Sequence, residues 1–203
     1  MRTICAFIVT MTAWLTATAA VPRLVDVCDS IDFGRDTIGG NTCQFIIIHS
    51  SYYAGDDHSP FWREGVVAQW REYDVSPHYY IDRDGTVYKM APDTAVCWHA
   101  GKSLMPGTDR DSLNFFSIGI ELINSKKTGP SNAQYISLAW LLDDLTERHD
   151  VTHIAGHADI APGRKTDPWQ FSWQRLATLV APRTRDAIIP HAAPSKPKKP
   201  RKR

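Results

Sequence analysis

The stretch Gln44-Phe45-Ile46-Ile47-Ile48-His49 holds four consecutive apolar residues and ends in a polar one. Such an unbroken apolar and β-branched run is typical of a strand covered on both faces, as at the centre of a parallel sheet. The imidazole at its end needs a partner, because burying an unpaired polar group is costly. The stretch therefore predicts a central strand with a functional group at its carboxyl end.

Further strands are indicated along the chain. Residues 78–81 and 86–90 are two β-rich runs joined by Asp82-Arg83-Asp84-Gly85, and an Asp-Gly turn between such runs predicts a β-hairpin. Residues 117–123 form another apolar run, and residues 151–154 form a shorter one.

Three segments have the helical spacing of apolar residues, at 59–73, 131–149 and 170–180. In the first, Ser59 and Pro60 suit the N-cap and the first helical position. In the second, the residues expected to face inward are Ile136, Leu138, Ala139, Leu142 and Leu145. Because helices alternate with strands and one hairpin, we predict an α/β fold, a single domain with a central mixed β-sheet flanked by helices.

Length and composition fit one domain with an extension at each end. The 203 residues are 43% apolar and 22% charged, which excludes a collagen-like, wholly disordered or multi-span membrane chain. Residues 1–20 combine Arg2, an apolar run and small final residues, as secretory signals do. The run is short for a membrane span, and an uncleaved anchor is the alternative. We expect an exported protein, periplasmic or extracellular, with an N-terminal extension at 21–42, the domain at 43–182 and a tail at 183–203.

The net charge of +1 conceals two opposite charges. Six of the last eight residues are Lys or Arg and the other two are Pro, so we expect a disordered basic tail. Residues 21–195 carry 16 basic and 22 acidic residues, a charge of about −6. Nucleic-acid binding is not expected of an exported enzyme. The tail is either a solvated end without function or a segment that binds anionic envelope polymers or lipid headgroups.

Three cysteines follow the expected signal, Cys28, Cys43 and Cys97. Export favours disulfides, and a bond between Cys28 and Cys43 would stabilise the fold by roughly 3 kcal/mol in the chain-entropy model. Cys97 would then be a small buried apolar residue, although other pairings stay open. The spacing offers no Cys-x-x-Cys metal motif.

Polar side chains stand at the ends of predicted strands or in the loops that follow. His49 ends the central strand, Glu121 interrupts another, and the loop after the last strand holds His157, Lys165 and Asp167. Loops at strand ends carry the sites of most α/β proteins. Two imidazoles and one carboxylate, with a fourth position open, are a ligand set of catalytic zinc. No short zinc motif such as His-Glu-x-x-His is present, so spacing alone supports this hypothesis weakly.

Six strings occur in a fixed order along the chain, namely Ile48-His49-Ser50, Val75-Ser76-Pro77-His78-Tyr79, Ile81-Asp82-Arg83-Asp84-Gly85, Trp98-His99-Ala100-Gly101, Ser117-Ile118-Gly119-Ile120-Glu121 and Gly156-His157-Ala158-Asp159-Ile160-Ala161-Pro162-Gly163-Arg164-Lys165-Thr166-Asp167-Pro168. Over about residues 43–180 the chain thereby resembles the zinc-dependent N-acetylmuramoyl-L-alanine amidases. That family includes bacterial anhydro-muropeptide amidases, phage amidase-type lysozymes and animal peptidoglycan recognition proteins. The last string is the most specific, and it resembles the branch whose third ligand is Asp rather than Cys.

The resemblance implies one Zn²⁺ bound by His49, His157 and Asp167, with Glu121 and Lys165 as the catalytic pair. Zinc lowers the pKa of its bound water to about 7. Glu121 would accept the water proton and deliver it to the leaving amine, while Lys165 would stabilise the developing oxyanion. The bond cleaved would join the lactyl group of N-acetylmuramic acid to L-alanine of the stem peptide, so peptidoglycan or muropeptides are the expected partners.

Simpler interpretations of the same residues stay open. Glu121 also suits a structurally paired carboxylate, Lys165 a solvated loop charge, and Asp167 a turn former before proline. Asp159 lies nearer to His157 in sequence, but we expect it to brace its loop.

His78, Trp98 and His99 are the candidate substrate-binding residues. Each has a structural alternative, a hydrogen-bonded histidine for His78 and His99 and a core residue for Trp98. Some relatives have Tyr near Pro77, where its hydroxyl assists the reaction, and without it that task would fall to the catalytic pair. The loop at 102–114 is expected to shape the groove.

Two functions compete for this site, an exported zinc amidase and a non-catalytic peptidoglycan-recognition module. Loss of a metal ligand is the usual sequence mark of the second, and all three ligands are present. The basic tail would affect where the protein acts rather than its chemistry. The sequence carries no signal for an oligomeric state.

Overall fold

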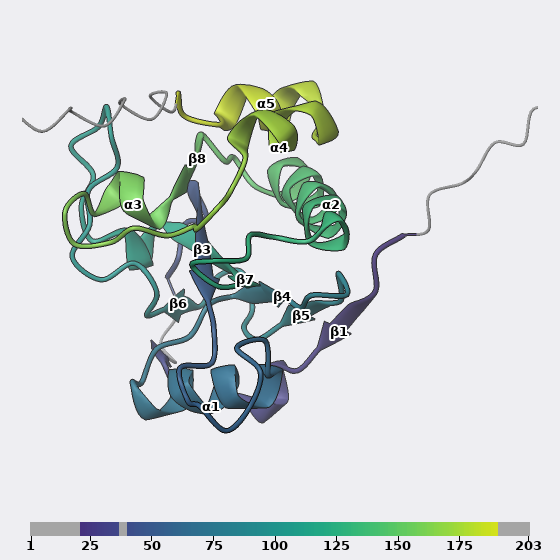
Figure 1. Ribbon diagram of the computed structural model, residues 1–203. Coiled ribbons are helices and arrows are strands. Elements are labelled where there is room, and N and C mark those ends of the chain that lie inside the picture. The colour runs from purple at the N-terminus through teal and green to yellow at the C-terminus, as the bar shows by residue number, and fades with distance from the viewer. Residues whose placement is uncertain (1–20, 37–39, 191–203) are drawn as a thin grey trace, which may run out of the picture.

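The computed structural model describes residues 21–36 and 40–190 (Figure 1), so the predicted signal and basic tail end lie outside the described residues. Its strands are β1 Leu24–Asp26, β2 Arg35–Asp36, β3 Phe45–Ser51, β4 Tyr79–Ile81, β5 Val87–Lys89, β6 Val96–Cys97, β7 Ser117–Ile123 and β8 His153–Gly156. Six of them form one sheet in the order β1-β5-β4-β7-β3-β8, while β2 and β6 form a separate pair. In the large sheet β4 and β5 are antiparallel and all other neighbours are parallel, which confirms the predicted mixed sheet.

Helices cover both faces of this sheet. They are η1 Cys28–Ser30, α1 Arg63–Glu72, η2 Leu113–Phe115, α2 Asn132–Arg148, α3 His157–Ile160, α4 Trp173–Leu179 and α5 Pro182–Ala187. Figure 1 shows α2, α4 and α5 together on one side of the sheet and α1 on the other. Among the described residues, no helix combines the length and the apolarity that a membrane crossing requires.

Strand β3 is the buried centre of the sheet, as predicted. Its side chains alternate between the two faces: Ile46 and Ile48 pack into the core under α2, whereas Phe45 and Ile47 belong to the core on the opposite side. By the same alternation His49 lies on the face of Ile47, away from α2.

The predicted helices form, with shifted boundaries. Helix α1 begins at Arg63 rather than near residue 59, because Ser59 caps a turn and accepts a hydrogen bond from the Phe61 N–H at 3.2 Å. Helix α4 begins at Trp173 rather than at Gln170, whose φ of 53° places it outside the helix. Ser172 caps that helix by accepting from the Arg175 N–H.

One residue of α2 that was predicted to face inward, Ile136, is instead 51% exposed. The helix is rotated toward two polar residues instead. Gln134 is buried and donates to the carbonyl oxygens of Ile81 and Ile123, and Ser137 donates to the carbonyl of Gly85. These bonds tie α2 to the strand ends and turn the neighbouring Ile136 to solvent.

The folded domain extends beyond the predicted residues 43–182 at both ends. Residues 24–26, placed in the extension, form β1 and pair in parallel with β5. Residues 182–187, placed partly in the tail, form α5, and Ile188 then bridges to Ile154 of β8. Prolines and basic residues suggested a disordered segment, but Ala187 is buried and Ile188 packs on the main core.

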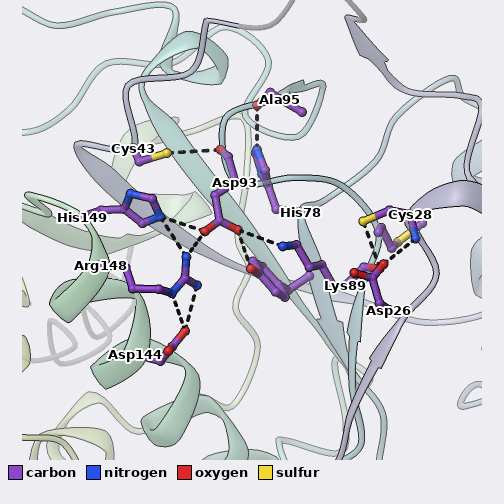
Figure 2. A network of polar contacts seen from close by, with 12 residues as sticks. Asp26, Cys28, Cys43, His78, Lys89, Asp93, Ala95, Asp144, Arg148 and His149 are labelled. Carbon is purple, nitrogen blue, oxygen red and sulfur yellow. Dashed lines mark hydrogen bonds and ion pairs between the residues drawn. The ribbon is translucent and has the colours of Figure 1, made fainter.

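The disulfide between Cys28 and Cys43 is not formed. Among the described residues Cys28, Cys43 and Cys97 are all free. The thiol of Cys43 faces the Asp93 carbonyl at 3.2 Å, whereas that of Cys28 faces the Lys89 carbonyl at 3.7 Å, and Figure 2 shows the two thiols on opposite sides of a polar network. Cys97 is buried, as expected.

Asp93 is the centre of that network (Figure 2). Its carboxylate, 7% exposed, accepts hydrogen bonds from Tyr79 of β4 and from Arg148 at the end of α2, and His149 Nε2 lies 2.8 Å away. Burial raises the pKa of Asp93, but the hydrogen bonds from Tyr79, His149 and Arg148 outweigh it and hold the pKa at about 2. The network therefore fastens the loop around Asp93 to both the sheet and α2.

We expect Asp93 to make stability depend on pH in acid. Its folded pKa is lower than its unfolded value, so its stabilisation is complete above about pH 4 and is lost as pH falls toward 2. Asp93→Asn should lower the free energy of unfolding by about 2 kcal/mol at pH 7 and converge with the unmodified protein near pH 2. Denaturant unfolding at a series of pH values measures this difference.

Asp32→Asn is the matched control, because Asp32 pairs with Arg71 on the exposed surface. Such pairs contribute about 0–1 kcal/mol, so this variant should stay close to the unmodified protein. A difference between Asp93→Asn and the unmodified protein that does not shrink below pH 4 would contradict the role given to Asp93.

Candidate metal and catalytic site

Strand pairing brings the first two candidate ligands together. His49 lies near the end of β3, and the parallel neighbour β8 ends at Gly156, opposite Ile48. His157 follows as the first residue of α3. The two imidazoles therefore meet at the carboxyl edge of the sheet, although they are 108 residues apart in sequence.

The loop after α3 returns Asp167 to the same place. The Ala158 N–H donates to the Asp167 carbonyl at 2.7 Å, and the Ser50 N–H lies 3.4 Å from Asp167 Oδ2. Asp159 accepts from the Gly156 N–H at 2.7 Å and closes the first turn of α3, which confirms the predicted bracing role.

Three potential ligand atoms converge at this point. His49 Nδ1 lies 2.9 Å from His157 Nδ1, and Asp167 Oδ2 lies 3.6 and 3.2 Å from the two nitrogens. All three side chains are buried. The Nε2 atom of His157 lies 3.3 Å from the Ala100 carbonyl, which can only accept, so Nδ1 is left with its lone pair. Lone pairs that converge without protons between them fit a bound cation, and two imidazoles with a carboxylate suit zinc.

The protonation states agree with metal binding, which requires neutral imidazoles and an ionised carboxylate. Burial and the neighbouring His157 lower the pKa of His49 to about 4.

Glu121 and Lys165 lie beside the three ligands. The register of β3 with β7 sets Glu121 opposite His49. Burial and the nearby Asp167 raise the pKa of Glu121 to about 8, against the hydrogen bond from Ser51 and the charge of Lys165. Its Oε2 atom is buried and has no hydrogen-bond partner among the described residues. A buried carboxyl group whose pKa is raised toward neutral pH, and whose Oε2 has no partner, is suited to exchange a proton.

These groups open into a cavity of about 280 Å³, whose lining includes Glu121, Lys165 and Asp167. Of the candidate substrate-binding residues, Trp98 and His99 line the cavity and His78 does not. His78 is completely buried, and its Nδ1 accepts from the Gly119 N–H at 3.0 Å. Its Nε2 lies 2.9 Å from the Ala95 carbonyl (Figure 2). Its role is therefore structural, the alternative left open by the sequence.

The structure adds cavity residues that sequence reasoning missed. Trp169 and Lys126 line the cavity, and the Lys126 Nζ lies 5.5 Å from the Trp169 ring centroid. Trp169 follows a predicted ligand by two positions, which was an available signal, whereas Lys126 is an exposed lysine without one. The loop at 102–114 lines a neighbouring cavity of about 490 Å³ instead, and Arg164 borders both cavities.

Fold and site together define an α/β protein with a three-ligand metal-type centre at the carboxyl edge of its sheet. Residues 39–170 match the family model of the N-acetylmuramoyl-L-alanine amidases, and the chain belongs to that family. It is 41% identical over 111 residues to the 1,6-anhydro-N-acetylmuramyl-L-alanine amidase AmpD of Citrobacter freundii. That match covers 53% of this chain and 58% of the relative, less than two thirds of its length.

Solved structures agree with this assignment. The crystal structure of a selenomethionine AmpD derivative is 30% identical, with a TM-score of 0.63 over 80% of this chain and 96% of that one. The Escherichia coli amidase AmiD, in complex with its substrate anhydro-N-acetylmuramic acid-L-Ala-D-γ-Glu-L-Lys, is 29% identical. Its TM-score is 0.58 over 71% of this chain and 60% of that one.

The geometry predicts one zinc ion per chain and its loss when a ligand is removed. Asp167→Asn removes the negative charge that the two imidazoles face. Loss of a residue that only hydrogen-bonds a metal ligand lowers metal affinity by about 10–100-fold, so loss of a ligand itself should lower zinc affinity by more than that. Metal analysis and competition with a chelator measure stoichiometry and affinity. Asp144→Asn, on the exposed side of α2, is the control and should bind zinc like the unmodified protein. Equal affinity in Asp167→Asn would contradict the ligand assignment.

Proposed function

We propose that this protein is an exported zinc-dependent N-acetylmuramoyl-L-alanine amidase. It hydrolyses the amide bond between N-acetylmuramic acid and L-alanine of the peptidoglycan stem peptide. The observation that carries this proposal is the convergence of His49, His157 and Asp167 beside Glu121 and Lys165. Family membership and the names of the relatives support the same bond as the substrate.

His49, His157 and Asp167 would hold the zinc, which when bound polarises the scissile carbonyl and acidifies water. Glu121 accepts a proton from the attacking water through its unpartnered Oε2 and then delivers it to the leaving nitrogen. Lys165 places a positive charge beside the carbonyl oxygen, where negative charge develops. One water is consumed, the lactyl group leaves as a carboxylate, and the stem peptide leaves with a free amine.

The substrate class follows from the relatives rather than from the cavity alone. AmpD is named for 1,6-anhydro-N-acetylmuramyl-L-alanine, and the AmiD complex holds an anhydro-muropeptide. We therefore propose soluble anhydro-muropeptides as substrates, with intact peptidoglycan as the comparison. Trp98 and Trp169, both in the cavity lining, offer aromatic surface to a sugar or peptide group.

Incubation with a defined anhydro-muropeptide should release the stem peptide, detected by mass spectrometry, and a chelator should abolish the release. Glu121→Gln should lower kcat by about 10²–10⁴-fold while bound zinc stays unchanged, because this residue moves the proton and does not bind the metal. Glu147→Gln, on the exposed surface of α2, is the matched control and should retain full activity.

Release that ignores the chelator, or full activity in Glu121→Gln, would refute the proposed mechanism. Binding of the muropeptide without release in the unmodified protein would favour the non-catalytic recognition module.

Export and the basic tail are proposed on the sequence of residues 1–20 and 196–203. After expression of the full chain in a bacterium, the mature protein should begin near residue 21 and be found outside the cytoplasm.

At low salt the mature protein should associate with anionic envelope surfaces more strongly than a chain ending at 195, with equal activity on a soluble muropeptide. Retention of Met1, or equal association of the two chains, would refute the corresponding proposal.

A further inference from the structure

His99 packs between His49, one of the three candidate metal ligands, and Gly119 of β7. Its ring packs edge-on against the His49 ring, with centroids 5.1 Å apart. On β7, a Cβ added to Gly119 would lie 2.5 Å from His99 Cγ, so no larger residue fits below the ring. The N–H groups of His99 and Ala100 both donate to the Asn114 side chain, which fixes the backbone of this loop. The ring therefore occupies one defined position.

The hydrogen bonds of His99 determine which of its nitrogens carries the proton. Its Nε2 lies 3.4 Å from both the carbonyl and the Oγ of Ser117. The carbonyl can only accept, and the Ser117 hydroxyl already donates to the Leu113 carbonyl at 2.6 Å. Both atoms thus accept from His99, so Nε2 carries the proton and Nδ1 has a lone pair.

That lone pair faces His49. His99 Nδ1 lies 3.0 Å from His49 Nε2, a hydrogen bond that requires the proton to be on His49. With its proton on Nε2, His49 keeps the lone pair of Nδ1, the atom that faces His157 and Asp167. The Ala100 carbonyl acts in the same way on His157 Nε2. Two consecutive residues of one loop therefore set the proton positions of both imidazole ligands.

His99 lines the cavity, a position from which a side chain could contact substrate directly. Both of its nitrogens are already bonded within the protein, to His49 and to Ser117. It has no polar atom left for a substrate. Instead of the substrate-binding role expected for it, His99 therefore has the role of a hydrogen-bond partner of the metal ligand His49.

We propose that His99 is a positioning residue that holds His49 in the tautomer and orientation in which Nδ1 binds the metal. This inference rests on the proposed function only in taking zinc as the metal. Histidine ligands generally donate their second nitrogen to a protein acceptor, and loss of such an acceptor costs about 10–100-fold in metal affinity.

Zinc affinity of the full chain, measured by competition with a fluorescent chelator, tests the proposal. His99→Phe keeps a ring over Gly119 but removes the acceptor, so the Kd for zinc should rise by about 10–100-fold. His99→Asn can place its Oδ1 near the position of Nδ1, because both atoms are bonded to Cγ, and it should recover most of the affinity. His58→Phe makes the same substitution at an exposed histidine that pairs with Asp57, so it should leave the zinc Kd unchanged.

Nitrogen-15 NMR of the histidine rings in the zinc-loaded, unmodified protein gives a second measurement that needs no variant to fold. We expect His99 to carry its proton on Nε2 alone. A proton on Nδ1 of His99, or a zinc Kd in His99→Phe equal to that of the unmodified protein, would overturn the inference while leaving the amidase proposal intact. Failure of the unmodified protein to bind zinc would overturn both.

Discussion

The convergence of three lone pairs on one buried point is the constraint on which the rest of this structure depends. Two imidazole nitrogens 2.9 Å apart, with a carboxylate oxygen beside them, repel one another in a medium that screens charge poorly. A cation at that point turns the repulsion into attraction. The parallel order of β7, β3 and β8 serves this end, because it delivers Glu121, His49 and His157 to one edge of the sheet.

The site divides into a rigid floor and an exposed rim. The floor consists of side chains on β3, β7 and the start of α3, and each is fixed by backbone pairing or by a buried hydrogen bond. Asp167 and Lys165 belong to the floor by function, because they lie in the loop after α3 and line the cavity together with Glu121. The rim consists of loop residues such as Lys126 and Trp169, which are partly or fully exposed. In the proposed reaction the preorganised floor carries out the chemistry, while the rim meets the parts of the substrate that vary.

The sequence predicted what burial and local chemistry encode. Strands β3 and β7 appear in the sequence as apolar runs because both of their faces are covered. The helix predicted from residue 131 is α2, and in the structure the Ser131 side chain caps it by accepting from the Gln134 N–H. Tertiary contacts set the rest. Ile136 faces solvent because buried polar neighbours rotate α2, and one-turn α3 depends on a hydrogen bond from Gly156 to Asp159. The metal ligands were predicted from the family resemblance and not from their spacing. The burial of His78 is visible only in the folded structure, where β4, β7 and the loop at Ala95 surround it.

The two segments that the sequence assigned to the flanks lie at the two edges of the sheet. Strand β1 covers the outer side of β5, and Ile188, with the Ile189 N–H bonded to the Ile154 carbonyl, covers part of β8. Open edges recruit strands from other molecules. A fragment trimmed to the family match at 39–170 would keep every metal ligand and yet uncover β5, part of β8 and the core face under α4 and α5, so it would tend to self-associate. The segment that holds the metal ligands is thus shorter than the segment that covers β5, β8 and the core.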